Sequence, residues 1–188
     1  LWTVEHVVVP AGYESPYPYS RSGKMAGGVE DFDLPDPLVW LAYVAAATET
    51  LLLGTGIVIL PQRNPLILAK EAASLSVLSG GRFVLGIGSG WLAEEFAALG
   101  VPFEDRGART DEYIGALRAL WAGAPASYSG EFVGFDSVYS RPQPAAGAVP
   151  IVVGGHSLRA ARRAGELGDG FFPNGASHEV VADLVVHA

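Results

Sequence analysis

Residues 78–96 read LSGGRFVLGIGSGWLAEEF, and this stretch decides the fold. Gly80 and Gly81 can adopt the left-handed conformation that ends a helix. The apolar run at 83–87 is typical of a strand covered on both faces. Glycine at every second position from Gly86 to Gly90 leaves the backbone bare at the carboxyl end of that strand, where α/β folds place their ligands. A ligand site explains these glycines, and a crowded corner that only glycine fits explains them equally well.

Composition favours a folded α/β enzyme. The chain has 188 residues, 49% of them hydrophobic, and a mean hydropathy of +0.28, which is enough for a sizeable core. A net charge of −8 and a sequence pI of about 4.9 argue against nucleic acid or an anionic membrane as partners. Without cysteine there is no disulfide framework, thiolate metal site or cysteine nucleophile. No signal peptide or membrane-spanning run is recognisable, so a cytoplasmic protein is expected.

The two ends of the sequence fall inside expected elements. The chain enters directly into an apolar run at Leu1 and stops within an expected helix at Ala188. We therefore interpret residues 1–188 as a single domain that is truncated at both ends.

Expected strands and helices alternate along the chain. Two helices open on a capping residue followed by proline, at Asp36-Pro37 and Asn64-Pro65. The alternation predicts a parallel sheet with right-handed crossovers, and both a doubly wound sheet and a (β/α)8 barrel fit it. A full barrel needs roughly 250 residues, so a barrel would be incomplete here. The expected strands are 1–9, 51–60, 83–87, 151–155 and 170–173; the expected helices are 36–50, 64–79, 92–99, 109–122, 158–167 and 178 onward, with 127–144 irregular or a short hairpin.

Residues 10–35 are expected to form a long loop rich in Pro, Gly, Tyr and Ser. A loop of this length within a compact domain more often has a functional role than serves only as a connection. We expect it to cover the substrate side of the site, where Tyr13, Tyr17 and Tyr19 are candidates for lining a pocket.

Polar residues stand out at two strand ends. Glu5 and His6 lie within an apolar run, where burial is costly without a partner or a use. His6 is either a structural histidine or a titratable group that faces a pocket. The sequence GGHS at 154–157 ends one strand and begins a helix. It fits either a phosphate-binding site or a plain strand-to-helix turn.

Several common site motifs are absent from the sequence. There is no phosphate loop ending in Gly-Lys-Ser/Thr, and residues 86–92 lack the third glycine of a dinucleotide fingerprint. No Gly-x-Ser-x-Gly elbow is convincing. The four histidines have no metal-ligand spacing, so no metal site is expected.

The order of the remaining motifs resembles the bacterial luciferase-like superfamily, in particular its coenzyme F420-dependent oxidoreductase branch. The resemblance covers essentially the whole chain, and the order and spacing of the motifs together make it specific. The motifs that carry it are WTVEH at 2–6, LGTG at 53–56, LPQRNP at 60–65, SGGRF at 79–83, GIGSGW at 86–91, PIVVGG at 150–155 and GDG at 168–170.

This resemblance implies a (β/α)8 barrel of the luciferase-like type, of which the chain holds about strands two to six. It implies F420, or alternatively FMN, at the carboxyl ends of the strands, with His6 as an acid/base or ring-positioning residue. The Gly56–Ile57 bond matches a non-prolyl cis peptide of the family. The implied cofactor-binding residues are Thr55, Gly56 and Ile57 behind the ring, Gly88, Ser89 and Gly90 along the channel, and Gly154, Gly155 and Asn174 near the phosphate.

Trp91 departs from the pattern of one group of relatives. Sugar-phosphate dehydrogenases of the superfamily carry an acidic residue at this position, so Trp91 argues against the same proton donor and the same substrate. Glu94 and Glu95 are expected on a solvated or packing face of a helix, and Arg63 is a weaker candidate for contacting substrate. A structural ion-pair network is expected among Arg106, Arg109, Asp111 and Glu112.

The resulting expectation is hydride transfer between F420 and a small organic substrate held beneath residues 10–35, with a homodimer as the assembly considered. The alternative is an FMN-dependent monooxygenase that resembles alkanesulfonate or alkanal monooxygenases, in which reduced flavin activates oxygen. A third alternative is a non-catalytic or truncated relative that only binds a ligand or a partner subunit, since an incomplete barrel leaves strand edges unpaired.

Overall fold

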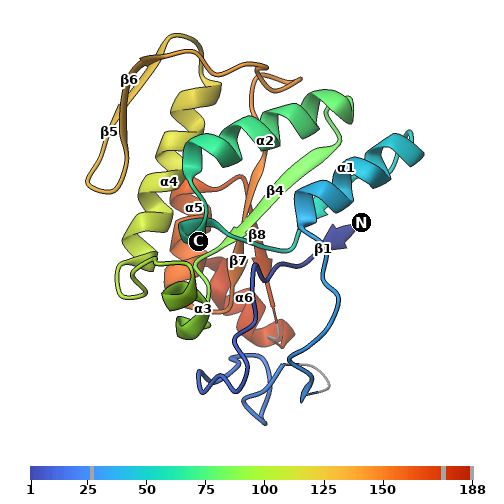
Figure 1. Cartoon of the computed structure of the whole chain (residues 1–188), viewed down its shortest axis with the longest axis vertical. Helices are drawn as coiled ribbons and strands as arrows, with labels where there is room; N and C mark the ends of the chain where they lie inside the picture. The colour runs from blue at the N-terminus through green and yellow to red at the C-terminus, as the bar shows by residue number, and fades with distance from the viewer. Residues whose placement is uncertain (26–27, 175–176, 187–188) are drawn as a thin grey trace.

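The computed structural model describes residues 1–25, 28–174 and 177–186, and a parallel sheet lies at its centre (Figure 1). Hydrogen-bonded neighbours run in the order β1-β2-β4-β7-β8, and β3 also pairs with β4. Every pairing within this sheet is parallel. The strands are β1 (Trp2–Thr3), β2 (Leu53–Thr55), β3 (Val58–Ile59), β4 (Phe83–Gly88), β7 (Ile151–Gly155) and β8 (Gly170–Pro173).

The sheet is open among the described residues. β1 and β8 stand at opposite ends of the strand order and do not pair with each other. The predicted α/β architecture with a parallel sheet is confirmed, and the unpaired outer edges fit a barrel that is incomplete in this chain.

Helices connect successive parallel strands, and two of them begin at the predicted capping residues. The Asp36 carboxylate accepts hydrogen bonds from two N–H groups in the first turn of α1, and the Asn64 side chain does the same at α2. The helices are α1 (Pro37–Ala47), the 3-10 turn η2 (Leu60–Gln62), α2 (Pro65–Leu78), α3 (Ala93–Ala98), α4 (Arg106–Trp121), α5 (Leu158–Leu167) and α6 (His178–Val186).

The hydrophobic core lies between the sheet and helices α2 and α4. Leu68 of α2 and Leu117 of α4 are fully buried and belong to the same cluster as Phe83 of β4. The indole N–H of Trp121 donates to the carbonyl oxygen of Ala69 at 3.1 Å, which satisfies the one polar group of that buried ring. This packing holds β4, and with it the glycine-rich exit, in the middle of the sheet.

The segment predicted at 127–144 as irregular or a short hairpin contains a hairpin. β5 (Ala126–Ser129) and β6 (Gly134–Val138) pair antiparallel. The Glu112 carboxylate accepts hydrogen bonds of 2.7–2.8 Å from the consecutive N–H groups of residues 131–133, and so ties the turn of the hairpin to α4.

The prediction of a strand over residues 1–9 is wrong beyond Thr3, because β1 pairs with β2 at only two residues. The N–H groups of Val7 and Val8 donate instead to the Glu95 carboxylate, at 2.7 and 3.3 Å. Since a side chain takes these backbone donors, the chain leaves the sheet soon after β1.

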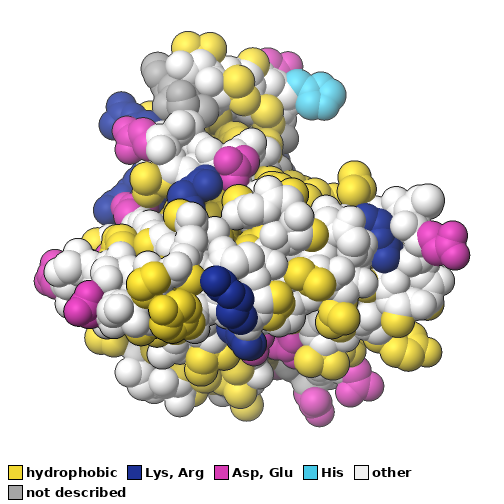
Figure 2. Space-filling view, turned by 90° about the horizontal axis from the view of Figure 1, so that it is seen from above, with side chains coloured by type: hydrophobic (Ala, Val, Ile, Leu, Met, Phe, Trp, Pro, Cys, Tyr) yellow, Lys and Arg dark blue, Asp and Glu magenta, His cyan; other side chains and the backbone are white. Residues whose placement is uncertain are grey.

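The described parts of residues 10–35 (10–25 and 28–35) lie at the carboxyl ends of the parallel strands, at the bottom of Figure 1, where α3 and α6 also lie. The opposite end of the molecule, formed by α2 and the hairpin, faces the viewer in Figure 2, and its Lys and Arg side chains are separated rather than gathered in a patch. Among the described residues, no helix combines the length and the apolar character needed to cross a membrane.

Candidate active site

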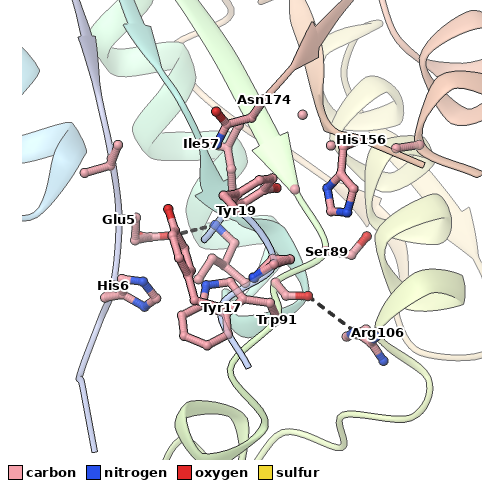
Figure 3. Close-up of a pocket in the computed structure, with 18 of the residues that line it drawn as sticks. Glu5, His6, Tyr17, Tyr19, Ile57, Ser89, Trp91, Arg106, His156 and Asn174 are labelled. Atoms are coloured by element: carbon pink, nitrogen blue, oxygen red, sulfur yellow. Dashed lines mark hydrogen bonds between the residues drawn. The ribbon is translucent and has the colours of Figure 1, made fainter. Parts of the chain in front are cut away.

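A cavity of about 820 Å³ opens at the carboxyl ends of the parallel strands. Its wall combines the residues after β1, the turn between β2 and β3, the exits of β4, β7 and β8, and part of residues 10–35 (Figure 3). This volume lies in the range of cofactor and ligand sites. The predicted site residues on its wall are His6, Gly56, Ile57, Gly88, Ser89, Gly90, Gly154, Gly155 and Asn174.

The glycines at the end of β4 have two different roles. A Cβ at Gly86 would overlap the carbonyl oxygen of Thr55, so this position is a crowded corner. A Cβ at Gly88 would lie 2.7 Å from Cδ1 of Ile57, and Gly90 has a φ of +78°, which favours glycine. The crowded-corner explanation therefore holds at Gly86. Gly88 and Gly90 line the cavity, where a ligand site stays a prediction.

Thr55 lies behind the cavity wall rather than on it. Its side chain is fully buried, and its hydroxyl donates to the carbonyl oxygen of Gly86 at 2.7 Å. The Gly56–Ile57 peptide bond that follows is cis, as the resemblance implies. Thr55 therefore braces β2 against β4 and does not itself reach a ligand in the cavity.

A buried carboxylate holds His6 at the cavity wall. Nδ1 of His6 lies 2.9 Å from Oε2 of Glu95, whose side chain is fully buried. The other oxygen of Glu95 accepts the N–H of Val7 at 2.7 Å, so the carboxylate acts as an acceptor on both sides. This arrangement favours the proton on Nδ1 and leaves Nε2 as the ring nitrogen that can exchange one.

The neighbouring Glu94 fixes the segment that covers the cavity. Its Oε1 accepts hydrogen bonds from the N–H groups of Glu14 and Ser15, at 2.7 and 3.0 Å. Hydrogen bonds, chiefly from the Ser15 side chain, lower the pKa of Glu94 to about 2. The expectation of a solvated or packing face holds for Glu95 as packing, since its side chain is fully buried. The sequence did not predict that each glutamate ties a backbone segment distant in sequence to α3.

Glu5 is buried beside His6 and is compensated by Arg63. Its carboxylate accepts the N–H of Ile59 at 2.6 Å and Nε–H of Arg63 at 2.8 Å. Burial raises the pKa of Glu5, and the Arg63 charge partly offsets that rise. Arg63 also pairs with Asp36 at 2.6 Å and lines a smaller cavity of about 300 Å³ instead of the main one. Because its guanidinium already forms ion pairs with two carboxylates, Arg63 is less suited to contact a substrate.

Positive charge gathers on the opposite side of the cavity, where α5 begins. Arg106, Arg159 and His156 line this wall, and Figure 3 shows Arg106 and His156 across the cavity from His6. Burial and the neighbouring Arg159 lower the pKa of Arg106, while Glu104 acts against them. Neither Arg106 nor Arg159 forms an ion pair within residues 1–25, 28–174 and 177–186.

The structure contradicts the ion-pair network predicted among Arg106, Arg109, Asp111 and Glu112. Arg109 pairs with Asp105 at 2.8 Å, and Asp111 pairs with Arg163. Arg163 also donates to Oγ of Ser89 at 3.3 Å. The four predicted residues do not form one network, because residues adjacent on a helix point in different directions. The pair of Asp111 and Arg163 instead supports the exit of β4 through Ser89.

The three loop tyrosines divide between the cavity and its support. Tyr17 and Tyr19 line the cavity, as predicted, but Tyr13 does not. Tyr13 is 3% exposed, its hydroxyl accepts the N–H of Met25 at 3.0 Å, and its ring packs edge-on against Trp91 with centroids 5.5 Å apart. Tyr13 therefore anchors the segment that carries the other two tyrosines.

The site thus combines a histidine that can move a proton, an apolar middle and a cationic rim. The part of the chain that the structure describes contains no group of three side chains that could hold a metal ion. Sequence reasoning found His6 and the glycines, but it missed Glu95, Arg106 and Arg159.

Known proteins similar in sequence indicate the family. The luciferase-like monooxygenase family model matches residues 3–188. The F420-dependent glucose-6-phosphate dehydrogenases of Beutenbergia cavernae and Nocardia farcinica are 37% and 35% identical over 161 and 163 residues, covering 82% of this chain and 47% of each relative. An uncharacterized protein of Mycobacterium tuberculosis is 33% identical over 181 residues, which cover 96% of this chain and 62% of the relative. The chain spans about half the length of the curated relatives it matches.

Solved structures agree with the sequence relatives. The monooxygenase RslO1 from Streptomyces bottropensis matches with a TM-score of 0.79 and 28% identity, covering 99% of this chain and 52% of that one. The coenzyme F420-dependent tetrahydromethanopterin reductase from Methanopyrus kandleri matches with a TM-score of 0.67 and 25% identity, over 75% of this chain and 45% of that one. The predicted family resemblance and its incomplete barrel are confirmed.

Proposed function

This chain belongs to the luciferase-like monooxygenase family, and we propose that it provides the cofactor and substrate site of a two-electron oxidoreductase that uses coenzyme F420. One observation carries the proposal: a single cavity joins a proton-exchanging histidine on one side to a cationic helix start on the other. A flavin or deazaflavin needs both features, since its ring is reactive and its tail carries a phosphate.

The start of α5 fits the cofactor phosphate. The Ser157 hydroxyl accepts the N–H of Ala160 at 3.2 Å, and its carbonyl oxygen accepts the N–H of Ala161 at 3.0 Å. The N–H groups of Leu158 and Arg159 have no partner within the helix. Gly155 has a φ of +147° and no side chain, so the backbone can approach a ligand closely. Arg106 and Arg159 add positive charge beside the helix start, where anions are already favoured.

The apolar middle of the cavity fits a flat ring. The side chain of Ile57 fills space that Gly88 and Gly154 leave open, since added Cβ atoms there would lie 2.7 and 2.6 Å from it. Phe172 of β8 stacks on Trp2 with ring centroids 5.1 Å apart. Both walls are apolar and braced by neighbouring strands, so they would hold the ring in one orientation and exclude water.

His6 would move the proton that accompanies hydride transfer. When bound, the cofactor ring supplies the hydride acceptor that converts an alcohol to a carbonyl. Nε2 of His6 would take up the hydroxyl proton released in that direction and return it in the reverse direction. Glu95 keeps the proton on Nδ1 and so keeps Nε2 ready to act as a base.

The named relatives favour F420 as the cofactor. Two of them are described as F420-dependent dehydrogenases, at 37% and 35% identity. Their glucose 6-phosphate substrate is not part of the proposal, because Trp91 stands where sugar-phosphate enzymes of the superfamily carry an acidic residue.

The second candidate is an FMN-dependent monooxygenase. The monooxygenase RslO1 superposes on 99% of this chain with a TM-score of 0.79, and its sequence identity is 28%. The phosphate seat and the ring walls fit FMN as well as F420, so the cofactor has to be decided by binding.

A side-by-side titration with F420 and FMN, followed by tryptophan fluorescence, tests the proposal. We expect micromolar or tighter binding of F420 and weaker binding of FMN, with His6→Ala leaving cofactor affinity within about twofold of the wild type and slowing proton-coupled turnover about 10²–10⁴-fold. Tighter binding of FMN would move the assignment to the monooxygenase. Binding of neither cofactor would contradict the proposal.

The proposal also covers the kind of substrate, the cellular location and the assembly of the protein. We propose a small-molecule substrate, a cytoplasmic location and a homodimer. Light scattering on the purified protein at several concentrations tests the assembly, and a monomer at every concentration would contradict the homodimer.

A further inference from the structure

We propose that the His6 side of the cavity binds an uncharged, largely apolar substrate, such as a cyclic or aromatic alcohol or ketone. The inference rests on the proposed function only in treating this side as the substrate end. Aromatic rings, apolar lining and the placement of charge each support it.

A chain of aromatic contacts crosses the cavity from His6 to α5. Trp91 packs edge-on against His6, with centroids 5.9 Å apart, and against Tyr17, at 5.1 Å. Tyr17 contacts Tyr19 at 5.3 Å, and Tyr19 contacts His156 at 5.0 Å. Figure 3 shows Tyr17, Tyr19 and Trp91 between His6 and His156. Trp91, which contacts His6, and Tyr17, which contacts Trp91, give the substrate end a mostly apolar surface of fixed shape.

Further apolar side chains lie at this end. Met25 is 8% exposed and lies in the same cluster as Trp91 and Tyr17. Leu34 lines both the main cavity and the smaller cavity beside Glu5 and His6. The described parts of residues 10–35 therefore cover the substrate end with hydrocarbon and aromatic surface.

The charges at the substrate end disfavour an anionic substrate. Glu5, Glu95 and Asp36 stand on this side of the cavity, with Arg63 as their nearby cation. Arg63 binds two of these carboxylates already. A phosphate or carboxylate on the substrate would therefore find no free cation at this end among the described residues, and it would face net negative charge.

A cationic substrate is disfavoured for a different reason. Both oxygens of Glu5 and both oxygens of Glu95 already accept hydrogen bonds, from Ile59 and Arg63 and from His6 and backbone N–H groups. An ammonium group would have to displace one of these partners. Arg106 and Arg159, which form no ion pair among the described residues, line the opposite wall, where the proposed cofactor phosphate sits.

Three probes with the same ring and different charge test the inference directly. They are cyclohexanone, cyclohexanecarboxylate and cyclohexylammonium, titrated calorimetrically into the protein with and without F420 or FMN. We expect cyclohexanone to bind about tenfold or more tightly than either ion. Equal or tighter binding of the carboxylate or the ammonium, or no binding of cyclohexanone in any titration, would overturn the inference.

Two variants locate the binding at the aromatic chain. Tyr17→Ala should weaken cyclohexanone binding about threefold to tenfold, because one aromatic contact is lost, and Trp91→Phe should weaken it less. Tyr43→Ala is the matched control, since Tyr43 is 72% exposed on α1 and does not line the cavity. Unchanged cyclohexanone affinity in both cavity variants, with normal thermal unfolding, would contradict the proposed location.

The failure of this inference and the failure of the proposed function give different results. Cofactor titrations without probe report the function, and the ranking of the three probes reports the substrate class. A protein that binds F420 but prefers cyclohexanecarboxylate would retain the function and lose the inference. A protein that ranks the probes as expected but binds neither cofactor would do the reverse.

Discussion

The two ends of the cavity are built in opposite ways. At the His6 end, the carboxylates of Glu5 and Glu95 are buried, and each accepts hydrogen bonds from a backbone N–H and from a side chain. At the α5 end, Arg106 and Arg159 line the wall without an ion pair among the described residues. The first end has its charges satisfied within the protein, and the second has positive charge available for a ligand.

This difference indicates that the His6 end positions the imidazole, whereas the α5 end binds the proposed cofactor. A buried carboxylate with all its partners in place fixes backbone and imidazole geometry, and it offers little to a ligand. Guanidinium groups at a helix start attract an anion and tolerate water in its absence. Changes at the His6 end should therefore affect stability and proton transfer, whereas changes at the α5 end should affect cofactor affinity.

The largest expected effect is that of Arg63→Ala, which removes the cation beside buried Glu5. We expect the free energy of unfolding at neutral pH to fall by about 3–5 kcal/mol, because an uncompensated charge stays buried. Burial raises the pKa of Glu5 already, and losing Arg63 raises it further. A carboxylate whose pKa is raised in the folded state costs stability when it is ionised. This cost is full above the folded pKa and disappears as the pH falls to the unfolded value of 4.5, so the deficit should shrink in that direction.

Urea unfolding at several pH values measures this effect. Arg141→Ala is the control, because Arg141 is exposed and forms no ion pair within the described residues. A loss below about 1 kcal/mol at neutral pH, equal to that of the control, would show that the ion pair does not support the His6 end.

The next effect is that of Glu95→Gln. The amide oxygen can still accept the N–H of Val7, but the amide nitrogen would face Nδ1 of His6 with its own hydrogens and favour the other tautomer. We expect a loss of about 1–3 kcal/mol in unfolding free energy and a switch of the His6 proton to Nε2. Nitrogen chemical shifts of the imidazole report the tautomer.

Glu166→Gln is the matched control for Glu95→Gln, since Glu166 is exposed on α5. An unchanged His6 tautomer in Glu95→Gln, with cofactor affinity lowered instead, would reverse the proposed division between the two ends.

The smallest effect concerns acid and the segment over the cavity. Hydrogen bonds lower the pKa of Glu94 from its ordinary value of 4.5 to about 2. A lowered pKa contributes stability above 4.5 that is lost as the pH falls towards 2, so the tie to Glu14 and Ser15 should weaken in that range. The protection of the Glu14 and Ser15 amides from hydrogen exchange, relative to the intrinsic rate at each pH, should fall there, and Glu94→Gln should remove this pH step. An equal fall in the variant would contradict this account.

The sequence predicted most of the secondary structure because its signals are local. Asp36 and Asn64 cap their helices within three residues, and the run at 83–87 forms the buried strand β4 (Phe83–Gly88). The strand at 1–9 was predicted wrongly because its apolar pattern gives no sign that Glu95 would take its backbone donors.

The site was predictable where it depends on backbone and not where it depends on distant partners. The glycines at the exits of β4 and β7 line the cavity as expected. The contact between His6 and Glu95 joins residues 89 positions apart, and nothing in either local pattern predicts it. The adjacent pair Glu94-Glu95 just after Trp91 was the one available signal, and its helix position suggested a solvated or packing face.

The most direct test of the division between the two ends compares each cofactor with its phosphate-free form. Affinities of F420 and the deazaflavin FO, and of FMN and riboflavin, would be measured for the wild type, Arg159→Ala and His6→Ala. We predict that the phosphate improves wild-type affinity about tenfold or more, that Arg159→Ala removes most of this gain, and that His6→Ala retains it. A gain that survives Arg159→Ala and disappears in His6→Ala would contradict the account.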